Sequence, residues 1–108
     1  MRETLRKPIP AKSCVEPSEL DSGALVIDVR EPEEFESGHV EGAINIPVDK
    51  LRERIMEIKH RGLVVTACGK GGGRSDRAAQ LLRDAGFKDA KALCGGTNAW
   101  FDYTKDLT

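Results

Sequence analysis

Two short, continuous apolar runs, residues 25–28 and 63–67, are the clearest strand signals in the chain. Both are rich in β-branched side chains and lack the alternation of apolar and polar positions that a half-exposed strand shows. This pattern is typical of strands that are buried on both faces of a parallel sheet. Weaker strand signals occur at residues 12–15, 44–46 and 90–93. The apolar pattern therefore predicts five strands.

Helical spacing of apolar residues separates these runs, most clearly over about residues 49–59 and 74–85. Gly86 is a natural stop for the second of these helices. Pro17 and Pro32 are each followed by acidic residues, which suits the first turn of a helix. Strands that alternate with helices predict a three-layer α/β domain, in which helices flank a central, mostly parallel five-stranded sheet.

The length of 108 residues fits one domain. We expect an N-terminal arm at residues 1–11, a single domain at residues 12–104 and a short tail at residues 105–108. Lys and Arg number 17 against 18 Asp and Glu, which gives a net charge of −1. This balance predicts neither a nucleic acid nor an anionic membrane as partner. With no apolar run of the roughly 20 residues that a bilayer requires, and no signal-peptide pattern in residues 1–10, we expect a cytoplasmic protein.

The chain has three cysteines, Cys14, Cys68 and Cys94, which cannot all pair with one another. A secreted disulfide scaffold has a denser, even set, so the sequence favours free thiols in a reducing compartment. No metal site is expected, because neither Cys-x-x-Cys nor His-x-x-x-His spacing occurs. Cys94 is interpreted as a packing residue beside two glycines, with a second thiol near the site as the alternative.

Candidate chemistry lies where the run at residues 63–67 ends. Cys68 follows directly, and a glycine-rich segment then leads to Arg74 and the helix predicted at residues 74–85. Glycines allow several amide N–H groups to turn toward one point. A helix N-terminus favours negative charge there, which favours the thiolate of a cysteine. Arg74 adds a forked positive charge for oxyanion groups.

Two interpretations of Cys68 remain open on this pattern. One is a nucleophilic thiolate, and the other is a small buried side chain on a tight glycine turn, since free cysteines are usually buried and inert. A nucleotide-binding loop is excluded, because the segment has neither the Gly-Lys-Ser/Thr ending nor the Gly-x-Gly-x-x-Gly spacing.

Three segments resemble, in the expected order, the signatures of the rhodanese family. The first is Asp28-Val-Arg-Glu-Pro-Glu-Glu-Phe35, followed by Gly38-His-Val-Glu-Gly-Ala-Ile-Asn-Ile-Pro47. The second runs from Cys68 through Arg74 and Ser75 into a helix with Ala78, Ala79 and Leu82. The third is Gly86-Phe87, followed by Leu93-Cys-Gly-Gly-Thr-Asn-Ala-Trp100. Together they cover about residues 25–100.

This resemblance implies a central parallel sheet flanked by helices and a thiosulfate sulfurtransferase activity that needs no metal or organic cofactor. The catalytic residue is expected to be Cys68, which carries sulfane sulfur as a persulfide between donor and acceptor. The expected donor is thiosulfate or a persulfide, and the expected acceptor is cyanide, a thiol or a sulfur-carrier protein. The residues expected to bind substrate are those of the loop: Gly69, Lys70, Gly71, Gly72, Gly73 and Arg74.

Four other residues of the signatures are expected to support the site. Asp28 and Arg30 are expected to anchor neighbouring loops through charge-assisted hydrogen bonds. His39 is interpreted as a scaffold residue rather than a general base, since a single histidine far from Cys68 in sequence is weak grounds for catalysis. Ser75 is expected to support the loop from the start of its helix.

The loop departs from the family in length. Five residues separate Cys68 from Arg74, where the usual rhodanese loop has four. The longer spacing resembles the protein-tyrosine phosphatase signature, which the rhodanese-like domains of cell-cycle phosphatases and certain arsenate reductases share. The histidine that precedes the cysteine in those phosphatases is Ala67 here. A phosphatase or arsenate reductase is therefore one alternative, and a catalytically silent interaction module is another.

Overall fold

The computed structural model describes residues 14–71 and 73–105. The expected arm at residues 1–11, the first two residues of the expected domain, Gly72 and residues 106–108 lie outside the described residues. Within the described ranges, no helix is both long enough and apolar enough to cross a membrane.

Five strands form one sheet in the order β2-β6-β5-β3-β4, and every neighbouring pair is parallel. The strands are β2 (Cys14–Val15), β3 (Leu25–Asp28), β4 (Ile44–Asn45), β5 (Val64–Ala67) and β6 (Lys91–Leu93). All four residues of the central strand β5 are buried, as are the last three of β3. The predicted fold class is therefore confirmed, and every strand pair among the described residues is parallel.

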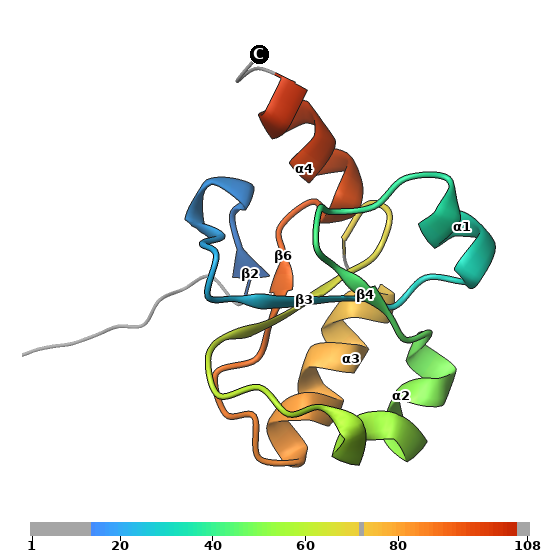
Figure 1. Cartoon of the computed structure of the whole chain (residues 1–108), viewed down its shortest axis with the longest axis vertical. Helices are drawn as coiled ribbons and strands as arrows, with labels where there is room; N and C mark the ends of the chain where they lie inside the picture. Colours follow the sequence, from blue (N-terminus) through green and yellow to red (C-terminus); the bar gives the residue numbers. More distant parts are fainter. Residues whose placement is uncertain (1–13, 72, 106–108) are drawn as a thin grey trace, which may run out of the picture.

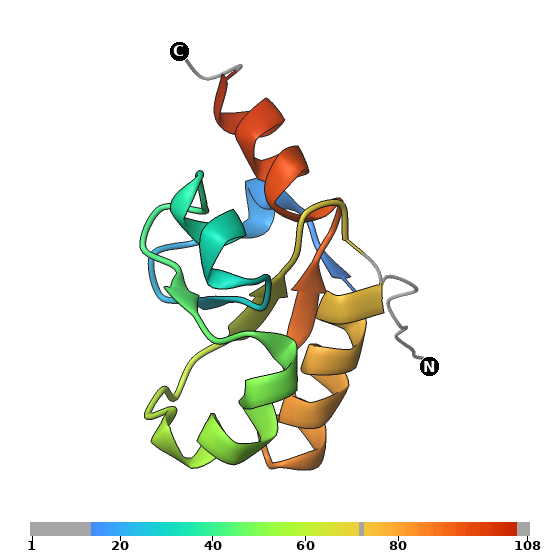
Figure 2. The same cartoon turned by 90° about the vertical axis from the view of Figure 1, so that its right-hand side faces the viewer.

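The helices lie on both faces of this sheet (Figures 1 and 2). They are α1 (Pro32–Glu36), α2 (Val48–Arg54), α3 (Gly73–Asp84) and α4 (Gly96–Lys105), with short 3-10 turns at η1 (Pro17–Glu19) and η2 (Ile55–Glu57). The right-handed rule for parallel crossovers explains the distribution. The connections through α2 and α3 advance toward β2, whereas those through η1 and α1 advance toward β4. The two sets of helices therefore cover opposite faces.

Each face has its own core. On one face, Leu51 of α2 and Leu82 of α3 pack against Ile27 and Val64 in a single apolar cluster. On the other face, a second cluster contains Val26, Val65 and Leu93, with Trp100 of α4 packed against it. Residues of β5 pack in both cores. Cys68, which follows this strand, is therefore held in a fixed position.

Helices α2 and α4 differ from what the sequence predicts. The helix expected over residues 49–59 ends at Arg54 and continues as the 3-10 turn η2. Helix α4 was not predicted, because Gly95 and Gly96 indicate a loop and the next two residues, Thr97 and Asn98, are poor helix formers. Both glycines do have positive φ, but α4 begins at the second of them.

The prediction that all three cysteines are free thiols is wrong. Cys14 and Cys94 form a disulfide, with their Cα atoms 5.1 Å apart. The parallel register places Cys14 opposite Ala92, so Cys94 lies only two residues beyond its partner position on the neighbouring strand. An odd number of cysteines still permits one pair. The disulfide therefore removes the free-thiol basis for expecting a reducing compartment. Cys68 is the free cysteine among the described residues.

Candidate active site

Cys68 lies directly after the carboxyl end of β5, the central strand of the sheet. Only 4% of the residue is exposed, and it belongs to the core cluster under α2 and α3. Its Sγ lies 3.3 Å from Oγ of Ser75, to which the thiol donates a hydrogen bond. A hydroxyl proton can rotate, so the same serine can donate to sulfur once the thiol is ionised.

The start of α3 is fixed against β5 by a second side chain. The hydroxyl of Thr66 donates a hydrogen bond of 2.7 Å to the carbonyl oxygen of Ser75, and both residues are fully buried. This contact ties the strand before Cys68 to the first turn of the helix after it. The distance between Cys68 and Ser75 is therefore set by the rigid core rather than by the glycine loop.

The loop is held from the other side by the first turn of α4. The amide of Thr97 donates to the carbonyl oxygen of Cys68 at 2.7 Å, and the amide of Asn98 donates to that of Gly69 at 3.0 Å. Both peptide groups are trans, so each N–H points opposite to its carbonyl. The amides of Gly69 and Lys70 consequently point away from α4.

Glycine is required where the loop meets α4. Gly96 has a φ of +66°, and a Cβ atom there would contact the carbonyl oxygen of Cys68 and lie 2.6 Å from the amide nitrogen of Gly71 and 2.8 Å from the carbonyl oxygen of Gly69. All three neighbours are backbone atoms, which have little freedom to move aside. Gly71 itself has a φ of +87°, a conformation that other residues rarely adopt.

We predict that Gly96→Ala destabilises the protein by about 3 kcal/mol, since it combines an unfavourable φ with overlap of backbone atoms. Gly42→Ala is the matched control, because Gly42 has a φ of +83° but no atom within 4 Å of the added Cβ. The free energy of unfolding of that variant should fall by only about 1 kcal/mol, the cost of a left-handed conformation for alanine. Urea unfolding measures both, and equal losses would contradict the close approach at Gly96.

Arg74, the second residue of α3, pairs with a carboxylate from α1. Its Nη1 donates to Oε1 of Glu34 at 3.1 Å and its Nη2 donates to Oε2 at 3.4 Å. The hydrogen bond to Arg74 is the main reason why the pKa of Glu34 is lowered, and the same contact raises the pKa of Arg74. Arg74 lies in the first turn of α3, directly before Ser75, the hydrogen-bond partner of Cys68.

Asp28 and Arg30 form a buried ion pair at the end of β3, with Arg30 Nη2 2.7 Å from Asp28 Oδ2. The same Nη2 donates to the carbonyl oxygen of Gly38 at 2.7 Å. Asn45 of β4 donates to the carbonyl oxygens of Asp28 and Arg30 at 3.0 and 2.9 Å. These contacts join the ends of β3 and β4 to the segment that follows α1. Helix α1 itself carries Glu34.

His39 lies against α1. Its ring stacks on that of Phe35, with centroids 3.7 Å apart and planes within 8° of each other. Its Nδ1 lies 2.8 Å from the carbonyl oxygen of Phe35. These contacts attach His39 to α1, and none of its hydrogen bonds in the described part of the chain reaches Cys68.

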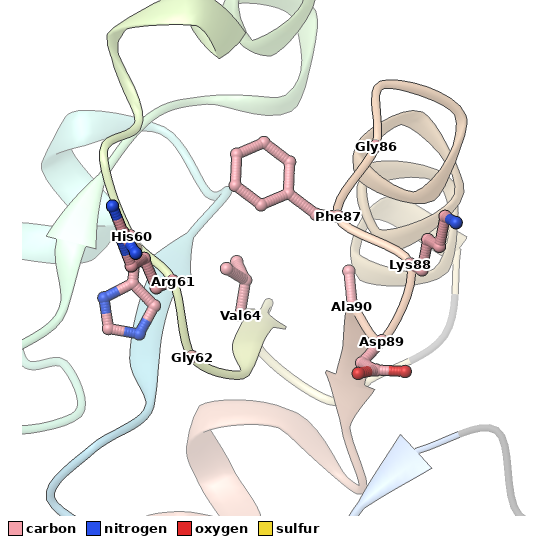
Figure 3. Close-up of a pocket in the computed structure, with 9 residues that line it drawn as sticks. All are labelled: His60, Arg61, Gly62, Val64, Gly86, Phe87, Lys88, Asp89 and Ala90. Carbon is pink, nitrogen blue, oxygen red and sulfur yellow. The ribbon is translucent and has the colours of Figure 1, made fainter.

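A hollow of about 310 Å³ lies at the opposite end of the sheet. Figure 3 shows Val64 and Phe87 in it, between the segment that precedes β5 and the one that precedes β6. It contains none of the residues that the sequence nominated for the site. The residues described in the structure also include no cluster of His, Cys, Asp or Glu suited to a metal ion.

The fold and the site define a class of protein: a parallel α/β domain with a buried cysteine loop at the carboxyl edge of its sheet. A sequence profile described as Rhodanese-like domain matches residues 15–103. The chain therefore belongs to the rhodanese family. Relatives that are named as sulfurtransferases support, at the level of the family, a sulfurtransferase function for this chain.

Three individual similarities illustrate the family match. The chain is 47% identical over 77 residues to the uncharacterized protein YqhL of Bacillus subtilis, covering 71% of this chain and 60% of that protein. It is 34% identical over 112 residues to the chloroplastic thiosulfate sulfurtransferase 16 of Arabidopsis thaliana, covering 93% and 92%. The crystal structure of a rhodanese-related protein from Thermoplasma volcanium superposes with a TM-score of 0.76 at 27% identity, covering 85% and 93%.

The structure adds residues that sequence reasoning did not nominate. Glu34 contacts Arg74 although 40 positions separate them, and Thr97 and Asn98 hold the loop from α4. Asn45 bridges two strand ends. The doubled glycine before Thr97 was a usable signal, because it indicates close backbone approach. Nothing local in the sequence indicates the partner of Glu34.

Proposed function

We propose that this chain transfers sulfane sulfur through a persulfide formed on Cys68. The observation that carries the proposal is a buried thiol at the start of a glycine loop, 3.3 Å from the hydroxyl of Ser75, with Arg74 next to Ser75 in the first turn of α3. Family membership supports the same chemistry, since a relative that matches over almost its whole length is named a thiosulfate sulfurtransferase.

The first half of the reaction loads sulfur from thiosulfate. The Cys68 thiolate attacks the outer sulfur, a new S–S bond forms at Cys68, and the S–S bond of thiosulfate breaks, with its electron pair leaving on sulfite. Lys70 and Arg74 attract the anionic donor. The amides of Gly69 and Lys70, which point away from α4, are the proposed hydrogen-bond donors to the persulfide.

The second half of the reaction unloads the sulfur. A thiol or cyanide attacks the outer sulfur of the persulfide, and the electron pair of the broken bond returns to Cys68 as thiolate. A sulfur-carrier protein is a further proposed partner. The burial of Cys68 favours donors and acceptors that are small or that present a slender reactive end. Asp28, Arg30 and His39 support the loops around the site and take no part in the chemistry.

The longer loop favours a phosphatase or arsenate reductase as the second candidate, because an additional residue widens the space for an oxyanion. Phosphate ester cleavage also requires a proton donor for the leaving group. Arg74 lowers the pKa of Glu34, the carboxyl group beside it, so Glu34 is ionised at neutral pH and is unsuited to this role. Asp76 lies exposed in the first turn of α3. We therefore rank sulfur transfer first.

Parallel assays with thiosulfate plus cyanide and with an aryl phosphate test this ranking. We expect thiocyanate to form catalytically. The kcat/KM for the aryl phosphate should be at least about a hundredfold lower than that for thiosulfate. A factor of this size is the usual contribution of a general acid. Efficient hydrolysis of the phosphate without thiocyanate formation would reverse the order of the two candidates.

A further inference from the structure

The guanidinium of Arg74 is already bonded to the carboxylate of Glu34. An anionic sulfur donor would need the same guanidinium. Both oxygens of the carboxylate face both terminal nitrogens of the guanidinium, at 3.1 and 3.4 Å. This fork-to-fork arrangement is the geometry in which arginine also binds sulfate-like and phosphate-like groups. The side chains are 43% and 40% exposed, so a ligand from solvent can reach the pair.

Glu34 is held in this position by its own helix. Its Oε1 accepts a hydrogen bond from the amide of Glu31 at 3.0 Å, which forms part of a capping box at the start of α1. A carboxylate anchored in this way loses little conformational entropy when it pairs with Arg74. The capping box therefore holds the carboxylate of Glu34 in the position where it meets Arg74.

The other charges near the site are also partly offset. The charge of Arg74 acts on Arg30, but Arg30 is itself bonded to the buried carboxylate of Asp28. The exposed side chain of Lys70 adds one cation on the loop. A donor that approaches Cys68 with two negative charges is therefore repelled by Glu34. The carboxylate of Glu34 is already bonded to Arg74, the group that would bind the donor.

We propose that Glu34 is a specificity-determining residue that competes with dianions for Arg74, so that the site favours organic persulfides over thiosulfate and binds phosphate-like oxyanions weakly. The inference rests on the proposed sulfur transfer through Cys68. An organic persulfide R–S–SH loads the enzyme as follows. The Cys68 thiolate attacks the outer sulfur, a new S–S bond forms, the old S–S bond breaks, and its electron pair leaves on RS⁻ while the proton stays on the outer sulfur.

The variant Glu34→Gln tests the inference, because glutamine keeps the oxygen that caps α1 and removes the negative charge. Glu33→Gln is the matched control. It removes the same charge from an exposed position of the same helix and leaves the contact between Glu34 and Arg74 intact. Thermal melting confirms that both variants remain folded.

The first readout is independent of turnover: protection of Cys68 by inorganic phosphate against alkylation with the uncharged reagent iodoacetamide. We expect Glu34→Gln to bind phosphate about fivefold more tightly than wild type, as removal of one partly exposed ion-pair partner suggests. Glu33→Gln should change the affinity by less than about twofold. Unchanged or weaker phosphate binding in Glu34→Gln would overturn the proposal, as would an equal gain in the control.

The second readout is the kcat/KM of loading with thiosulfate and with the persulfide of a small uncharged thiol. Glu34→Gln should raise the ratio of thiosulfate to organic persulfide efficiency about fivefold, mainly through a lower KM for thiosulfate. An unchanged ratio contradicts the proposal. If the wild-type protein transfers no sulfur from either donor, the proposed function fails, and the phosphate measurement still decides whether Glu34 competes for Arg74.

Discussion

Replacing Cys68 with serine is expected to lower sulfur transfer from thiosulfate to cyanide by at least roughly a thousandfold, the order of loss seen when a nucleophile is removed. Serine fits the buried position and leaves the contact to Ser75 sterically possible, but its hydroxyl does not form a persulfide. The rate of thiocyanate formation measures the effect.

The Cys68→Ser variant should melt within a few degrees of wild type, because the loop is held by backbone contacts from α4 that the substitution does not touch. Loss of activity together with a retained fold assigns the chemistry to the sulfur atom. Residual turnover within about tenfold of wild type would mean that another group carries the reaction.

Removal of the disulfide between Cys14 and Cys94 is expected to lower the free energy of unfolding by about 4 kcal/mol. The two cysteines are separated by 80 positions, and the cost of closing a loop of this size in the unfolded chain is of that order. A domain of ordinary stability has only about 5–15 kcal/mol in total. Urea unfolding of the double variant Cys14→Ser/Cys94→Ser measures the difference.

Wild-type protein in the presence of a dithiol reductant is the matched comparison. It should unfold like the double variant, and the reductant should have no effect on the variant itself. Thiol counting in denaturant should give one reactive cysteine before reduction and three after it. Three reactive thiols in the unreduced protein, with no change of stability upon reduction, would contradict the disulfide.

The central part of the fold was predictable because its signals are local. The apolar runs of β3 and β5 are buried along nearly their whole length, and a continuous apolar run has few alternatives. The position of Cys68 follows from the same pattern, since a residue after a buried parallel strand lies at the carboxyl edge of the sheet.

What sequence reasoning missed depends on pairs that are distant in the chain. Cys14 meets Cys94 only because β2 pairs with β6, and no pattern around either cysteine reveals that neighbour. Glu34 meets Arg74 because the fold brings α1 next to the first turn of α3. Helix α4 was missed for a different reason. Gly96 is the first residue of this helix, and it is a glycine because the backbone of the Cys68 loop passes close to it.

The mass of the intact protein after incubation with thiosulfate reports directly on a persulfide at Cys68. We expect a gain of one sulfur atom, located on Cys68 by fragmentation and removed by cyanide. Cys68→Ser should show no gain, whereas Cys14→Ser/Cys94→Ser should still acquire the sulfur. A protein that stays unmodified, or that carries the sulfur on a different cysteine, would show that Cys68 is not the sulfur carrier.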